Sequence, residues 1–149
     1  MLRPTDETLD ITRRNVLAVR GGFDTAFVGL KYGRWLGSTP FTIGLGVGTD
    51  GGVNITPYVQ VVPLQIKGLS LYTQFSALYS PFDGLLIGED TILLGGFVGL
   101  QLWPSQLRSV SLYLNVGLGV MYVLKGAAEG GLGEGYTEPS SNIQIGIAF

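Results

Sequence analysis

The residue types that most often carry out catalysis are scarce in this chain. Its 149 residues include no histidine and no cysteine, so neither an imidazole base nor a thiolate nucleophile is available. The carboxylates of Asp83, Glu89 and Asp90 are close enough in sequence to be considered as an acid–base pair. Carboxylates in loops are usually solvated surface charges, however. We therefore predict that the protein is not an enzyme and has no catalytic residues.

Binding motifs are equally scarce. The glycine-rich segment Gly126–Gly135 lacks the Lys-Ser/Thr ending of a phosphate-binding loop, and its charges are acidic. The acidic residues also lack the spacing of an EF-hand calcium loop. A formal net charge of −2 gives no support to nucleic-acid binding. We predict no metal site, no cofactor and no nucleic-acid partner.

The elements that must position any site are defined by where charge is missing. Only 13% of the residues are charged, about half of the fraction typical of soluble domains, and the mean hydropathy is +0.36. No run of about 18 apolar residues exists, so no transmembrane helix is predicted. Six stretches contain no charge, and each could hold a strand of ~9–11 residues, the length that crosses a bilayer when tilted: 35–49, 51–66, 68–82, 91–107, 109–124 and 139–149.

Apolar side chains alternate with small or polar ones within these stretches. In one example, Phe41, Ile43, Leu45 and Val47 alternate with Thr42, Gly44, Gly46 and Gly48. A period of two predicts β-strands rather than helices. We count eight strands, at residues 15–23, 26–35, 41–48, 53–62, 69–79, 91–103, 110–123 and 141–149.

Two prolines make the fourth strand the weakest of the eight. Pro57 and Pro63 each remove a hydrogen-bond donor from the ladder, which a central strand tolerates poorly. We expect a bulge near Pro57 and expect Pro63 to lie at or beyond the end of the strand. A sheet of six or seven strands is the alternative.

The last nine residues carry the strongest signal for a particular kind of sheet. An uninterrupted apolar face is followed by a terminal aromatic, while the opposite face is small or polar, as in the closing strand of a bacterial outer-membrane barrel. The apolar face consists of Ile143, Ile145, Ile147 and Phe149. With the alternation elsewhere, it predicts an all-β, antiparallel, up-and-down transmembrane β-barrel over residues 15–149. Residues 1–14 are expected to form a polar periplasmic segment.

On these residues the chain resembles the small eight-stranded outer-membrane barrels of bacteria, such as the membrane domain of outer-membrane protein A. The resemblance implies that Ile143, Ile145, Ile147 and Phe149 form the signal read by the barrel-insertion machinery. It also implies a mature protein in the outer membrane, with the lipid bilayer as its surroundings. The outer loops are shorter than those of adhesion-type barrels, so adhesion is not predicted.

Charges and aromatics sort by the end of the barrel at which they fall. If the chain starts in the periplasm, the outer connections hold eight acids and one base, namely Asp24, Asp50, Asp83, Glu89, Asp90, Lys125, Glu129, Glu134 and Glu138. The inner end holds Arg13, Arg14, Arg34, Lys67 and Arg108. Aromatic residues near the strand ends predict interfacial girdles, with Trp35, Phe41, Trp103 and Phe149 inside and Phe23, Tyr79, Phe82 and Tyr122 outside.

Arg20 and Lys31 are the only charges in the central parts of the predicted strands, and their parity places both in the lumen. A position facing lipid would cost each about 2–4 kcal/mol near the membrane midplane. We expect a polar network to solvate them, consisting of Tyr58, Gln60, Tyr72, Gln74, Tyr113, Asn115 and Gln144. Glycines on the same face would make room for aromatic side chains that plug the narrow lumen.

Three functions remain open at this stage. The leading hypothesis is an integral outer-membrane barrel with a structural or anchoring role, acting as a monomer or as a subunit of an envelope assembly with other envelope proteins. The second is a narrow channel or small-ligand passage lined by Arg20 and Lys31. The third is a soluble, lipocalin-like barrel that binds an apolar ligand inside.

Overall fold

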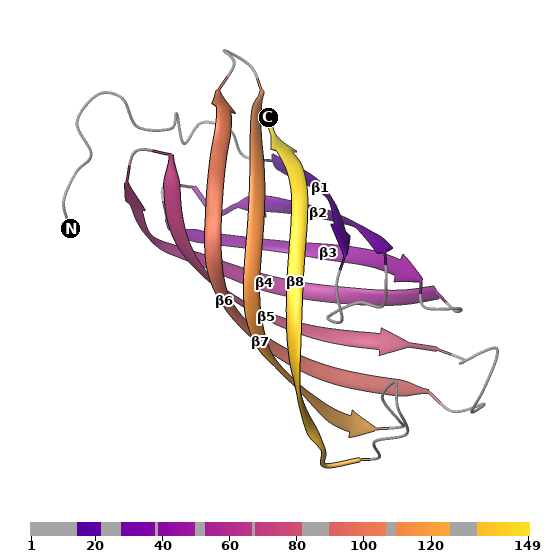
Figure 1. Cartoon of the computed structure of the whole chain (residues 1–149). Helices are drawn as coiled ribbons and strands as arrows, with labels where there is room; N and C mark the ends of the chain where they lie inside the picture. The colour runs from indigo at the N-terminus through magenta and orange to yellow at the C-terminus, as the bar shows by residue number, and fades with distance from the viewer. Residues whose placement is uncertain are drawn as a thin grey trace.

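Eight antiparallel strands close into a single barrel in the computed structural model (Figure 1). The structure describes residues 15–21, 28–37, 39–49, 53–66, 68–81, 90–106, 110–125 and 134–149. Each strand pairs with its sequence neighbours, and β1 pairs with β8. The all-β, eight-stranded prediction is therefore confirmed. The strands are β1 (Asn15–Gly21), β2 (Val28–Trp35), β3 (Phe41–Thr49), β4 (Val53–Ile66), β5 (Leu69–Ser80), β6 (Thr91–Gln106), β7 (Ser111–Lys125) and β8 (Thr137–Ala148).

Hydrogen bonds between the two ends of the described chain close the barrel. The β1–β8 ladder runs from the pair Val16 and Ala148 to the pair Gly21 and Ile143. Beyond it, the backbone N–H of Asn15 donates to the carbonyl of Phe149 at 3.0 Å, and the N–H of Phe149 donates back at 2.9 Å. We call this end of the barrel the terminal end, and the opposite end the loop end. Closure leaves no free sheet edge along the paired part of the wall.

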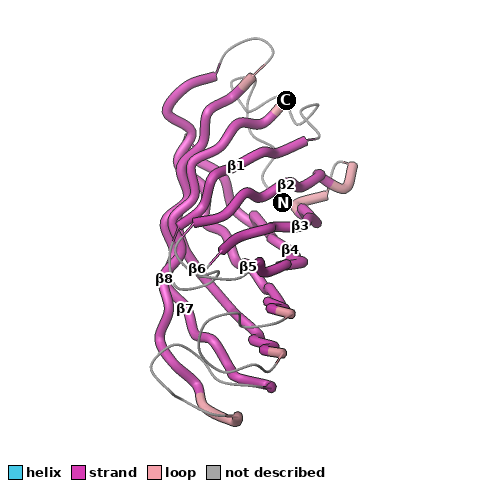
Figure 2. The backbone as a smooth tube through the Cα atoms, turned by 90° about the vertical axis from the view of Figure 1, so that its right-hand side faces the viewer, coloured by secondary structure: helices cyan, strands magenta, loops and turns pink. Residues whose placement is uncertain are grey.

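The wall of the barrel is uneven in height. Strands β1 to β3 have seven to nine residues, whereas β4 to β8 have 12 to 16. Figure 1 shows the long β6, β7 and β8 side by side, with the short β1 next to β8. In Figure 2 the described backbone consists of strands joined by loops. No helix among the described residues has the length and apolar character to span a membrane.

The prolines act differently from our expectation for the fourth strand. β4 continues past Pro63 to Ile66, and its register against β5 shifts between Val61 and Leu64. No bulge forms at Pro57, because the β4–β5 register is the same on both sides of it and Pro57 itself pairs with Leu45 of β3. The irregularity thus lies at Pro63 instead, where the register shift leaves residues of β4 outside the regular ladder, so the missing N–H of proline costs little.

Alternation along each strand separates two faces of the wall. In β2, β5 and β7, for example, outward side chains are exposed or half-buried while inward ones are mostly buried. Apolar side chains form the outer face on every strand, represented in chain order by Val19, Leu30, Val47, Val59, Phe75, Val98, Leu118 and Ile145. Most polar side chains of the strands face the lumen, as expected for a barrel with opposite inner and outer faces.

The aromatic side chains near the strand ends do not all behave alike. Phe41, Tyr79, Tyr122 and Phe149 are exposed on the outer face, as the girdle prediction requires. The two tryptophans depart from it: Trp103 is buried inside the barrel and Trp35 packs partly buried against the same cluster. The predicted girdle positions at 23 and 82 lie outside the described residues.

The predicted sorting of charge can be followed only in part. Asp90, Lys125, Glu134 and Glu138 lie at the loop end, and Arg34 lies at the terminal end. The remaining charged positions of that prediction fall outside the described residues, as do the expected N-terminal segment 1–14 and the acid–base candidates at 83 and 89.

Candidate functional site in the barrel lumen

The centre of the lumen is occupied by the ammonium group of Lys31. Its Nζ donates hydrogen bonds to Oε1 of Gln60 (3.2 Å), Gln74 (2.7 Å) and Gln144 (2.9 Å). Nζ also lies 3.7 Å from the centre of the Tyr58 ring, within cation–π range. We call these four surrounding side chains the amide cage.

Strands that are far apart in sequence supply the amide cage. Lys31 comes from β2, Tyr58 and Gln60 from β4, Gln74 from β5 and Gln144 from β8. Each of these side chains is almost completely buried. The contacts therefore cross the lumen and tie together opposite parts of the wall.

Amide–amide hydrogen bonds extend the cage along the lumen. Nε2 of Gln144 donates to Oε1 of Gln74 at 3.1 Å and to Oδ1 of Asn142 at 2.9 Å. The hydroxyl of Tyr72 donates to the same Asn142 oxygen at 3.5 Å. Asn142 was not among the predicted network residues, although its parity matches that of Gln144. The network holds the carbonyls of Gln74 and Gln144 toward the cation.

Arg20 lies flat against the wall beside this network. A Cβ built at Gly46 would come within 2.4–2.8 Å of its guanidinium atoms, and one at Gly29 would meet its Nε at 3.1 Å. The side chain therefore runs from β1 across β2 to β3 on a surface that only glycine leaves open. The structure places both predicted lumen charges inside, and only Lys31 contacts the amide cage in the hydrogen bonds described above.

The same arrangement of glycines accommodates the large aromatic side chains. Tyr58 lies over Gly33 and Gly44 of the two preceding strands, and Tyr72 lies over Gly99 and Gly117 of the two following strands. In each case a Cβ on the glycine would overlap the ring or hydroxyl. Glycine on the lumen face thus leaves space in which each bulky side chain packs against the backbone of the wall. This explains why the two residue types share that face.

We predict that the lumen glycines that contact aromatic side chains do not tolerate even one added methyl group. At Gly119 an added Cβ would lie 2.0 Å from the carbonyl oxygen of Gly96 and 2.7 Å from the ring of Phe97, so backbone must move. Gly119→Ala should lower the free energy of unfolding by about 1–3 kcal/mol, as overpacked interiors do. Urea titration of the folded barrel in detergent would measure it.

Gly96 provides the matched control for this prediction. On the outer face of β6, its added Cβ would approach nothing closer than a Phe75 ring carbon at 3.8 Å. Gly96→Ala should therefore change the free energy of unfolding by no more than about 0.5 kcal/mol. Equal losses of unfolding free energy in the two variants would contradict the proposal that lumen glycines make space for the aromatic side chains.

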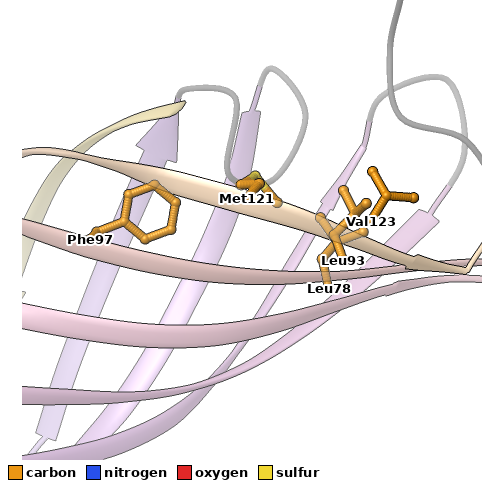
Figure 3. Close-up of a cluster of buried hydrophobic side chains, with 5 residues drawn as sticks. All are labelled: Leu78, Leu93, Phe97, Met121 and Val123. Carbon is orange, nitrogen blue, oxygen red and sulfur yellow. The ribbon is translucent and has the colours of Figure 1, made fainter. Parts of the chain in front are cut away.

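Apolar side chains fill both ends of the lumen. At the terminal end, the ring of Tyr113 packs at a tilt against Trp103 with ring centres 5.4 Å apart, next to Val16, Ala18 and Ala148. At the loop end a second cluster, shown in Figure 3, is formed by Leu78, Leu93, Phe97, Met121 and Val123. The cage is thus polar and central, with apolar layers above and below.

One row of polar side chains in the lumen includes several buried atoms without a hydrogen-bond partner among the described residues. Ser70 of β5, Gln101 of β6, Asn115 of β7 and Gln144 of β8 stand opposite one another in successive ladders. Within the described part of the chain, Ser70 Oγ, Gln101 Oε1 and both amide atoms of Asn115 have no hydrogen-bond partner. Asn115 is therefore inside, as predicted, but it does not join the bonded network around Lys31.

The predicted insertion-signal residues lie together on the outside of the closing strand. Ile143, Ile145, Ile147 and Phe149 are all exposed, and they alternate with buried side chains of β8. Ile143, Ile145 and Ile147 pair with β1 on one side and β7 on the other, so this apolar row runs along the seam of the barrel.

No protein-family model, curated protein or solved structure matches this chain. Among the described residues, no three acidic, histidine or cysteine side chains cluster as metal ligands would.

Proposed function

We propose that the chain is an integral bacterial outer-membrane β-barrel with a structural, anchoring or assembly-subunit role and without catalysis. The observation that carries this proposal is the outer face, which is apolar on every strand around the closed wall. In a bilayer this face would contact hydrocarbon, and the closed ladder would satisfy the backbone groups within the wall.

The soluble, lipocalin-like alternative requires the opposite orientation of side chains. Such a barrel would turn its apolar rows toward an internal ligand and its amides toward water. Here Val47 and Ile143 are exposed, whereas Asn115 and Gln144 are fully buried. Soluble monomers rarely expose contiguous apolar patches beyond a few hundred Å². These orientations favour the membrane proposal.

Membrane association is tested most directly by folding the chain with and without lipid. We expect a folded form that migrates faster than the heat-denatured chain in detergent gels and that floats with phospholipid vesicles. Proteinase treatment of those vesicles should spare β4 to β8. A monomer that stays folded and soluble without detergent or lipid would refute the proposal.

The channel alternative has one observation in its favour, the burial of Arg20 and Lys31 in the lumen. The amide cage lies at the centre of the lumen and a buried apolar cluster lies toward each end, however, as expected for the narrow interior of an eight-stranded barrel. We therefore predict that the wild-type protein gives no stepwise current in planar bilayers. Reproducible anion-selective steps that disappear in Arg20→Ala or Lys31→Ala would instead establish a passage.

A further inference from the structure

The surroundings of the Lys31 Nζ match the chemistry of a primary ammonium group. An ammonium group has three N–H donors, and three carbonyl oxygens of the amide cage accept them at 2.7–3.2 Å. The face of the Tyr58 ring, 3.7 Å away, adds the negative side of an aromatic quadrupole. The three described acceptors thus equal the number of N–H donors, and the aromatic ring adds a contact with its π-face.

The described oxygen atoms that accept from the Lys31 ammonium all belong to side-chain amides. These oxygens are neutral, and no described acidic side chain is buried in the lumen. Neutral oxygens select by the number and direction of donors rather than by net charge. A quaternary ammonium has no N–H to donate, and a guanidinium presents a planar fork instead of three converging donors. The arrangement is therefore specific for the –NH₃⁺ group.

Contacts independent of Lys31 hold the cage in shape. Gln144 is oriented by donating to Gln74 and Asn142, and Tyr58 is fixed flat over Gly33 and Gly44. Two of the three acceptors, Gln74 and Gln144, are thus oriented by one another as well as by the cation. Such preorganisation lowers the ordering cost of binding a ligand.

We propose that the amide cage is a binding site for primary ammonium groups, that Lys31 is its tethered occupant, and that a free primary alkylammonium ion binds there when residue 31 is shortened. Lys31→Ala removes three methylenes and the ammonium group, which together correspond to n-propylammonium. This inference concerns the lumen alone, so it stands or falls separately from the proposed membrane role.

The experiment compares unfolding of Lys31→Ala with and without n-propylammonium chloride. The protein is folded in octyl glucoside and phosphate buffer at pH 7, because Tris and choline-based detergents are themselves ammonium compounds. Above the dissociation constant, each tenfold rise in propylammonium should lower the unfolding equilibrium constant about tenfold. If the variant folds only when propylammonium is present, the yield of folded barrel reports the same binding.

Three controls separate specific binding from a salt effect. Tetramethylammonium chloride and sodium chloride at equal ionic strength should leave Lys31→Ala unchanged. Lys31→Met, whose side chain keeps the volume filled, should not respond to propylammonium. Lys31→Ala/Gln74→Leu, which lacks the acceptor at 2.7 Å, should lose most of the response. Equal stabilisation by the quaternary ion, or no stabilisation by propylammonium, would overturn the proposal.

A measurement on the wild-type protein keeps the proposal testable if Lys31→Ala does not fold under either condition. The buried Lys31 should give a slowly exchanging ammonium signal in ¹⁵N-lysine NMR spectra. That signal should be missing from Lys31→Met. A wild-type spectrum in which every lysine ammonium exchanges rapidly with water would refute the caged state.

Discussion

Gln74→Leu should lower the free energy of unfolding by about 3 kcal/mol, because it removes the closest acceptor of a buried cation. Oε1 of Gln74 accepts from the Lys31 ammonium at 2.7 Å and from Gln144 at 3.1 Å. Hydrogen bonds to charged groups contribute about 1.5–3 kcal/mol, and the loss of the second bond adds to this. Leucine keeps much of the volume but offers no acceptor, and the site is fully buried from water.

A double-mutant cycle identifies the origin of that loss. In the Lys31→Met background there is no ammonium to leave unsatisfied, so Gln74→Leu should cost at least about 1 kcal/mol less than in the wild type. Urea unfolding of the barrel in lipid vesicles, followed by tryptophan fluorescence, gives the four free energies. Additive effects would show that Gln74 acts through packing and its hydrogen bond from Gln144 rather than through the Lys31 ammonium.

The outward neighbour of Gln74 serves as the matched control. Thr73 lies on the same strand with its side chain on the opposite face of the wall. Thr73→Val should change the free energy of unfolding by no more than about 0.5 kcal/mol. A loss comparable to that of Gln74→Leu would indicate a general sensitivity of β5 rather than the loss of a cation acceptor.

Alternation made the strands and their faces predictable from sequence. Each strand keeps one apolar and one small or polar face through its centre, so period two alone places Lys31, Gln60, Gln74 and Gln144 inside. It does not show that they meet at one atom. That meeting depends on the relative stagger of four strands, and one of the bonds joins residues 113 positions apart.

Predictability falls at the ends of the strands, where both faces become apolar. In the run from Ile92 to Leu94, hydrophobicity does not distinguish Leu93, which is buried in the lumen, from its exposed or half-buried neighbours. Leu93 lies two residues before Gly95 and four before Phe97, so the period of two places all three on the lumen face. Val123 and Leu78 are likewise buried apolar residues near strand ends, and only the parity of their strands distinguishes them from outward-facing residues.

The proline prediction failed for a different physical reason. A strand tolerates a proline where its register shifts by one residue, because the proline then lies outside the regular ladder and its missing N–H breaks no ladder hydrogen bond. β4 shifts at Pro63, and β6 likewise shifts between Leu102 and Ser105, on either side of Pro104. Both shifts lie near the terminal end of the barrel, beyond the regular centre of the wall. Pro57 lies within that centre, where both neighbouring strands keep their register.

If lipid surrounds the wall, an arginine on the outer face should be destabilising in proportion to its depth. Val98 lies at the middle of β6, the longest strand, with its side chain 59% exposed. Leu124 is similarly exposed (51%) but lies one residue from the end of β7. A charged side chain costs about 2–4 kcal/mol at the bilayer midplane and about 0–1 kcal/mol near the interface.

We therefore expect Val98→Arg to lower the free energy of unfolding in vesicles by about 2–4 kcal/mol and Leu124→Arg by no more than about 1 kcal/mol. In water the two variants would be equivalent, because exposed positions away from special contacts tolerate substitution within about 0.5 kcal/mol. The difference in unfolding free energy between the two variants thus shows whether lipid or water surrounds the wall. Similar, small effects at both positions would place water there, and the membrane proposal would fail even if the amide cage binds its cation as inferred.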